Sequence, residues 1–298
     1  MKILTEASGS MTAAYMIRAI QSAGHEAVAS DIIPDIAARK LADEFVKFPV
    51  SSDPTLWDKV PALLIEHGID LVIPSLDETL AGWAERRNAL QVTANCHVII
   101  SPVPTITTFQ DKWKTYLFFC ENGVPCPATS LQQDFALVKP RFGRGGTGVS
   151  VPDALVNMDG MISQEYLEGT EYTIDVFCDK DSDPVYIVPR RRIEVQDGKS
   201  TGGKVQVHRG IAEWIRAICS ATKFVGPVNM QCFLTPDGDI RFVEVNPRIA
   251  GGMALGFAAT ENWVALLVSH FVEGNPVNPV PVKDGLRMMR YYSEVFFS

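Results

Sequence analysis

A glycine-rich segment near the middle of the chain has the residue types needed to hold a chain of phosphates. Lys139 ends a short apolar run, Arg141 and Arg144 follow it, and four of the six residues from 143 to 148 are glycine. Glycine lets backbone N–H groups approach phosphate oxygens closely, and the lysine and arginines supply positive charge. The segment is not a Walker A loop, because no Gly-Lys-Ser/Thr follows the glycines. A flexible surface hairpin is the alternative, but a strand that delivers a lysine into the loop favours phosphate binding.

Oxygen-bearing side chains gather on a predicted hairpin further along the chain. Glu244 and Asn246 lie two residues apart on one predicted strand, and so point to the same face of it. Gln231 lies on the preceding strand, across a Pro-Asp-Gly turn at 236–238, and can face them. Three hard oxygen ligands on one sheet face suit Mg²⁺, although an ordinary hairpin with a polar wet side fits equally well. Arg248, just beyond, is placed to neutralise a transferring phosphoryl group.

Two further segments carry weaker signals. The segment 164–167 has backbone donors and acceptors that suit an adenine ring, and Glu171 can accept hydrogen bonds from ribose hydroxyls, but acidic turns of this kind are usually only solvated. Arg190 and Arg192 share one face of a predicted strand, so they are candidates for a clamp on a substrate carboxylate or phosphate, with simple surface charge as the alternative. A mobile-looking loop, 198–204, follows them. His208 is either a general base or, as lone histidines usually are, structural.

The elements that must position these residues change in character along the chain. The first hundred residues alternate short apolar strands with helices, which predicts a parallel sheet with helices on both faces. The predicted strands are 2–5, 26–30, 70–73 and 97–100, and the predicted helices are 11–23, 57–67 and 77–87. A Pro-rich hinge at 101–105 and a helix at 110–122 follow. Beyond residue 135 the pattern favours antiparallel strands, with helices at 210–224 and 263–271, so the fold class is α/β with an α+β C-terminal part.

Composition narrows the class of protein. The 298 residues include 46% hydrophobic residues and carry a net charge of −8, which favours packed lobes and disfavours a nucleic-acid partner or an anionic membrane surface. Six cysteines without a C-x-x-C pair fit reduced core residues better than disulfides or a zinc site. The N-terminus shows no signal-peptide pattern, and no apolar run reaches 18 residues, so we expect a cytoplasmic protein without a membrane span.

Taken in order, these residues resemble the ATP-grasp superfamily, and most closely its carbamoyl-phosphate-synthase-like branch of stand-alone carboxylate–amine ligases. The resemblance extends upstream to Leu71-Val-Ile-Pro-Ser-Leu-Asp-Glu78 and Asp111-Lys112, and so covers nearly the whole chain. It implies an ATP-grasp fold preceded by a Rossmann-like lobe. The implied domains are an N-terminal lobe (1–104), a small lobe with a glycine-rich lid (105–167) and a C-terminal lobe with the metal and substrate sites (168–298). Only 24 residues separate Lys139 from Gln164, which predicts a shortened lid lobe.

The resemblance also implies a role for each candidate residue. Lys112 and Lys139 would hold the phosphates, with Gly145, Gly146 and Thr147 in the lid over ATP. Gln164, Glu165, Tyr166 and Leu167 would line the adenine pocket, and Glu171 would bind ribose. Gln231, Glu244 and Asn246 would hold two Mg²⁺ ions, with Mn²⁺ able to substitute, and Arg248, Arg190 and Arg192 would act on the phosphoryl group and the substrate.

The activity implied is an ATP- and Mg²⁺-dependent ligase that activates a small carboxylate as an acyl phosphate and couples it to an amine, releasing ADP and phosphate. The alternatives are a phosphotransferase that stops at a phosphorylated product and a non-catalytic nucleotide-binding module. The expected partners are small-molecule carboxylates and amines, with a homodimer allowed. With no glutamine-hydrolysing or biotin domain in the 298 residues, we expect free ammonia or an amine as the nucleophile. The sequence does not identify either substrate.

Overall fold

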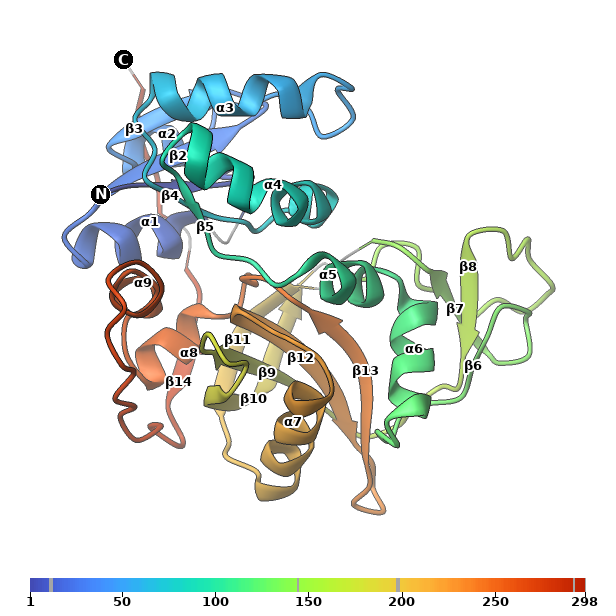
Figure 1. The fold of residues 1–298 in the computed structure, drawn as a ribbon. Coiled ribbons are helices and arrows are strands. Elements are labelled where there is room, and N and C mark those ends of the chain that lie inside the picture. Colours follow the sequence, from blue (N-terminus) through green and yellow to red (C-terminus); the bar gives the residue numbers. More distant parts are fainter. Residues whose placement is uncertain (11–12, 144, 197–198, 292, 298) are drawn as a thin grey trace.

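The computed structural model describes residues 1–10, 13–143, 145–196, 199–291 and 293–297, and its first sheet is the predicted parallel one (Figure 1). The strand order of this sheet, sheet A, is β3-β2-β1-β4-β5, and all neighbours are parallel. Its strands are β1 (Lys2–Thr5), β2 (Glu26–Asp31), β3 (Glu44–Lys47), β4 (Leu71–Ile73) and β5 (His97–Val98). The edge strand β3 was not among the predicted strands.

Helices cover both faces of sheet A because its strands are apolar on both sides. Ile3 and Leu71 pack on one face among residues of α1, whereas Leu4 and Val72 pack on the other among residues of α3 and α4. The helices of this region are α1 (Ala13–Ser22), α2 (Ala38–Leu41), α3 (Leu56–Glu66) and α4 (Leu80–Thr93), with a 3₁₀ turn, η1 (Asp77–Thr79), before α4.

The predictions of a hinge at 101–105 and of a single helix at 110–122 are wrong in detail. A helix, α5 (Val103–Gln110), begins inside the hinge, because Pro104 sits in the first turn, where a missing N–H costs nothing. Asp111 then adopts an extended conformation and ends α5. Its side chain accepts a 2.9 Å hydrogen bond from the Trp113 backbone N–H, which caps a second helix, α6 (Lys112–Glu121). Two helices therefore stand where one was predicted.

A small antiparallel sheet, sheet B, follows α6 in the order β6-β8-β7. Its strands are β6 (Thr129–Ser130), β7 (Leu137–Pro140) and β8 (Met161–Gln164). In the described residues between β7 and β8 the chain forms turns and bends with one isolated bridge, and no helix. This agrees with the shortened lid lobe expected from the spacing of Lys139 and Gln164.

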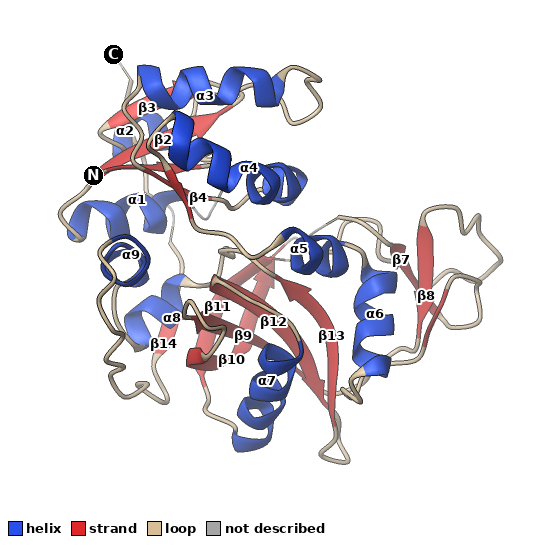
Figure 2. Cartoon of the chain, viewed as in Figure 1, coloured by secondary structure: helices blue, strands red, loops and turns tan. Residues whose placement is uncertain are grey.

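The largest sheet, sheet C, is antiparallel in the order β13-β12-β9-β10-β11-β14. Its strands are β9 (Thr170–Cys178), β10 (Pro184–Gln196), β11 (Lys199–Val205), β12 (Gly226–Leu234), β13 (Ile240–Asn246) and β14 (Arg287–Met289). The predicted hairpin between β12 and β13 is confirmed, with its turn at 236–238. The helix α7 (Arg209–Ala221) packs against one face, as Figure 2 shows, and α8 (Ala254–Ala259), α9 (Trp263–Leu267) and the π-helical turn η2 (Val268–Val272) follow.

The predicted fold class is confirmed: a parallel α/β part precedes an antiparallel α+β part. The short helix α8 was not predicted, and the lobe boundaries at 104/105 and 167/168 remain predictions. Within the described part of the chain, no helix combines the length and apolar character that a bilayer crossing requires.

Candidate active site

The candidate site is built on the polar face of sheet C, which the alternation of its strands creates. In β9, Glu171, Thr173 and Asp175 alternate with the buried residues Tyr172 and Ile174. The apolar set packs against the buried face of α7. The polar set therefore faces the opposite side, where Glu171 and Thr173 line a cleft of about 900 Å³, a volume typical of small-molecule sites.

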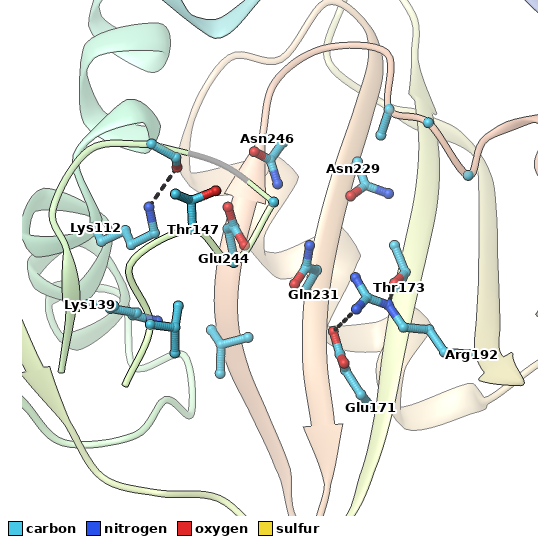
Figure 3. A pocket seen from close by; sticks show the side chains of 18 of the residues that line it. Lys112, Lys139, Thr147, Glu171, Thr173, Arg192, Asn229, Gln231, Glu244 and Asn246 are labelled. Atoms are coloured by element: carbon cyan, nitrogen blue, oxygen red, sulfur yellow. Dashed lines mark hydrogen bonds and ion pairs between the residues drawn. The ribbon is translucent and has the colours of Figure 1, made fainter. Parts of the chain in front are cut away.

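The three proposed metal ligands meet on this polar face. Gln231 pairs with Glu244 across the β12–β13 ladder, and Asn246 lies two residues beyond Glu244 on the same side of the strand. Figure 3 shows their side chains directed into one space, with Lys112, Lys139 and Thr147 on the opposite side. Asn229, which pairs with Asn246, lines the same cleft and was not predicted. Its position two residues before Gln231, on the same face of β12, is the signal that could have identified it.

These side chains fit a magnesium ion bound together with a nucleotide. In the described part of the chain, no three His, Cys, Asp or Glu side chains are grouped to share a metal ion. The candidate set therefore consists of one carboxylate, Glu244, and the amide oxygens of Gln231 and Asn246. Mg²⁺ commonly binds one or two carboxylates, retains several waters and takes its remaining ligands from substrate phosphates. The donor chemistry suits that mode, with the ion held between the protein and a triphosphate.

The opposite wall of the cleft carries the lysines and the glycine loop. The Lys112 Nζ donates a 2.8 Å hydrogen bond to the Gly143 carbonyl, which ties the start of α6 to the loop. The Lys139 Nζ donates a 2.8 Å bond to the Gln164 Oε1 in a buried setting. Burial lowers the pKa of Lys139 to about 8, and Lys112 adds to this effect while Glu244 opposes it. Gly145, Gly146 and Thr147 line the cleft, and Arg144 lies outside the described residues.

The proposed adenine and ribose residues line the same cleft. One part of the cleft wall is formed by Gln164, the last residue of β8, and by the three residues after it, Glu165, Tyr166 and Leu167. Glu171 lies in the same wall at the start of β9. The Gln164 side chain bridges two strands, because it accepts from Lys139 and donates to the Thr129 Oγ1 at 2.9 Å. Its role in the structure is thus to hold Lys139 as well as to shape the wall.

The two predicted arginines of β10 line the cleft, each with an acidic partner from β9. The Arg190 Nε and Nη2 donate to the two carboxylate oxygens of Asp175 at 2.8 and 3.1 Å, and both residues are buried. The Asn229 Nδ2 also donates to Asp175 at 2.9 Å. The Arg192 Nη1 lies 3.3 Å from a Glu171 carboxylate oxygen, and burial raises the pKa of Glu171 although Arg192 opposes this. Both arginines are therefore oriented by the sheet itself.

Arg248 has an acidic partner from the N-terminal region. Its Nε and Nη2 donate to the two carboxylate oxygens of Asp77, each at 2.7 Å, and its Nη1 donates to the Ile249 carbonyl at 3.0 Å. Its Nη2 also lies 3.4 Å from the Asn246 Oδ1. The sequence predicted Arg248 as a site residue but did not predict Asp77, because the two are 171 residues apart.

The segment after β10 contributes less than expected. His208 is absent from the residues that line the cleft; its Nδ1 accepts from the Ile211 backbone N–H at 3.2 Å and caps α7. Residue 198 of the expected cover loop lies outside the described residues, and 199–204 form part of β11. The remainder of the cleft is lined by residues from two other parts of the chain. These are Ala250, Gly251, Gly252 and Arg290, and Ala7, Ser10, Ser75 and Leu76 of the N-terminal region.

Comparison with known proteins agrees with this geometry. Residues 157–294 match a family described as ATP-grasp in the biosynthetic pathway with Ter operon. The chain is 27% identical over 143 residues to the carbamoyl-phosphate synthase of Methanobrevibacter smithii, covering 41% of this chain and 39% of that protein. It is 26% identical over 171 residues to the 3-methyl-D-ornithine–L-lysine ligase of Methanosarcina mazei, covering 56% of this chain and 43% of that protein. The matches thus span about two fifths of each relative.

A solved structure extends the likeness in fold to almost the whole chain. The N5-carboxyaminoimidazole synthetase of Staphylococcus aureus, solved with ADP, superposes with a TM-score of 0.73 at 15% identity, over 97% of this chain and 82% of that one. At this level of sequence identity the superposition shows a similar fold and nothing about function. The family match over residues 157–294, the two curated relatives and this shared fold agree with the order of the site residues, and all of them are similarities to ATP-grasp enzymes.

Proposed function

We propose that the chain is an ATP- and Mg²⁺-dependent ligase that joins a small carboxylic acid to an amine. One observation carries the proposal: Gln231, Glu244 and Asn246 face the Lys112, Lys139 and glycine-loop wall across a single cleft. A triphosphate between these walls would meet cations on one side and a metal-binding face on the other. The similarity to a ligase that joins 3-methyl-D-ornithine to L-lysine supports an amino acid or related small acid as substrate.

In the proposed reaction the protein positions reactants and neutralises charge. A carboxylate oxygen of the acid attacks the γ-phosphorus of ATP, and the bond to the β–γ bridging oxygen breaks, which yields an acyl phosphate and ADP. The amine nitrogen then attacks the acyl carbon and loses a proton, and inorganic phosphate leaves. Lys112 and Lys139 would hold the phosphate chain, and Arg248 would contact the phosphoryl group as it transfers. Gln231, Glu244 and Asn246 would hold magnesium, which would supply further charge neutralisation.

The test is ADP release measured with Mg²⁺ across a panel of amino acids, singly and in pairs, with mass analysis of the products. A ligase requires one acid and one amine and releases one ADP and one phosphate for each condensed product. A phosphotransferase would instead release ADP and accumulate a phosphorylated acid.

Glu244→Gln is the matched variant for this assay, because it keeps the side-chain shape and removes the only carboxylate of the candidate metal set in the described residues. We expect ADP release to fall at least about a hundredfold, with an unchanged circular dichroism spectrum. Undiminished release by this variant would refute the metal assignment.

A further inference from the structure

An ion pair connects the N-terminal region with the candidate active site. Asp77 begins η1, four residues after the end of β4 of sheet A, and its carboxylate accepts hydrogen bonds from both the Nε and the Nη2 of Arg248 at 2.7 Å. A two-point pairing of this kind fixes the plane and direction of a guanidinium, not only its charge. Both side chains are largely buried, with 21% of Asp77 and 11% of Arg248 exposed, so water screens the pair only weakly.

The remaining contacts of Arg248 complete its orientation. A guanidinium has five N–H groups. Its sequence neighbours Asn246 and Ile249 accept two of them, in addition to the two that Asp77 accepts. Among the described residues these contacts account for four N–H groups, and the fifth, on Nη1, is the one that can meet an anion in the cleft. Burial acts to lower the pKa of Arg248, but Asp77 and Glu244 together raise it, so the side chain stays charged.

The loop that carries Asp77 is itself held firmly. Glu6, directly after β1, is buried, and its carboxylate accepts from the backbone N–H of Ser75 at 3.0 Å, the Thr79 hydroxyl at 2.9 Å and the Trp83 indole at 2.7 Å. The Gln110 side chain donates to the Asp77 carbonyl from α5. Asp77 therefore projects from a loop that is fixed on both sides, and is not a flexible surface acid that happens to meet an arginine.

We propose that Asp77 is a positioning residue of the active site, which holds the Arg248 guanidinium in the orientation required to contact the transferring phosphoryl group. The inference rests on the proposed function, because that function assigns the contact to Arg248. It makes the N-terminal region a part of the catalytic apparatus, acting through one carboxylate and one guanidinium. The Asp77 carboxylate touches neither substrate nor nucleotide in this scheme.

The test compares Asp77→Asn with Asp77→Glu and with a matched control, Asp53→Asn. Asp53 lies in the same region, is similarly exposed at 22%, and pairs with Lys59 at 2.8 Å on the surface away from the cleft. We expect Asp77→Asn to lower kcat roughly 10- to 100-fold, Asp77→Glu to recover part of that loss, and Asp53→Asn to match the wild type.

Nucleotide binding supplies a readout that does not require turnover. Asp77→Asn should bind a non-hydrolysable ATP analogue at least about threefold more weakly than the wild type, while its affinity for ADP, which lacks the γ-phosphate, stays unchanged. Urea unfolding of Asp77→Asn, Arg248→Met and the double variant tests the pair itself. The urea concentration at the unfolding midpoint of the double variant should be close to that of the less stable single variant, because both substitutions remove the same interaction.

The outcomes separate the two proposals. A wild-type protein that condenses no acid and amine, but whose Asp77→Asn variant loses selectivity for the ATP analogue, would end the ligase proposal and support the positioning role. An active wild type whose Asp77→Asn variant behaves like Asp53→Asn would overturn the positioning role alone. A variant with higher kcat or tighter binding of the acid would also overturn it, because Asp77 would then be competing with the substrate for Arg248.

Discussion

Lys139 makes nucleotide binding sensitive to pH in a range where most lysines are fully charged. The residue is 8% exposed, and burial lowers the pKa of its side chain to about 8 from the ordinary value of 10.5. Below pH 8 the free lysine is charged and ready to meet a phosphate oxygen, whereas above pH 8 it is neutral. A bound triphosphate favours the charged form, so binding above pH 8 requires the lysine to take up a proton.

The magnitude follows from this pKa. With a value near 8, about 90% of free Lys139 is charged at pH 7, about half at pH 8 and about 10% at pH 9. If only the charged form binds well, the dissociation constant for the Mg²⁺–nucleotide complex rises about tenfold between pH 7 and 9, or about 1.4 kcal/mol. At pH 8, binding should take up about half a proton.

Calorimetry in buffers of different ionisation enthalpy measures both quantities. The apparent binding enthalpy at pH 8 should vary with the buffer, and its slope gives the number of protons taken up. Lys139→Arg keeps its charge at every pH and should show neither the slope nor the tenfold change, and Lys139→Met should bind weakly throughout. An enthalpy independent of the buffer, with an affinity that is the same at pH 7 and 9, would refute the reasoning.

Two further substitutions test how the arginines of the cleft are held. Asp175→Asn should lower the free energy of unfolding by about 3–5 kcal/mol in urea, because it leaves the buried Arg190 without its charged partner. Glu213→Gln breaks the exposed pair with Arg209 and should change stability by less than about 0.5 kcal/mol, which makes it the control. Gly252→Ala would place a Cβ 2.3 Å from the Arg190 Nη2, so we expect a loss of ligase activity with a fall in melting temperature; a fully active, equally stable variant would show that the guanidinium moves aside at little cost.

Features with local periodic signals were predictable from the sequence. Strand alternation placed Glu244 and Asn246 on one face, and the Pro-Asp-Gly turn set Gln231 opposite them, as the β12–β13 register now shows. The parallel sheet of the first hundred residues followed from short apolar runs between helices. These predictions succeeded because period and turn chemistry act over a few residues.

Features that depend on distant partners were not predictable. Asp77 reads as the first turn of a helix, and nothing near it in the sequence indicates that it pairs with an arginine 171 residues away. Asp111 reads as a helical residue, and nothing near it indicates that its carboxylate also accepts a hydrogen bond from Arg141, 30 residues further along the chain. The short edge strand β3 and the helix α8 are too brief for their periodicity to stand out. In each case tertiary contacts decide the conformation, and local propensity carries little weight.

The acidic partners of the arginines bear on how the cleft handles negative charge. Arg190, Arg192 and Arg248 each pair with a carboxylate of the fold, so the net positive charge they offer a ligand is small. Their value lies in fixed N–H directions, which need no reorganisation when charge moves during phosphoryl transfer. The lysines differ: Lys112 and Lys139 bond only to a carbonyl and an amide oxygen among the described side-chain contacts, so their charge stays available for a triphosphate. We therefore expect removal of a lysine charge to weaken nucleotide affinity, and removal of an arginine's acidic partner to slow the chemical step.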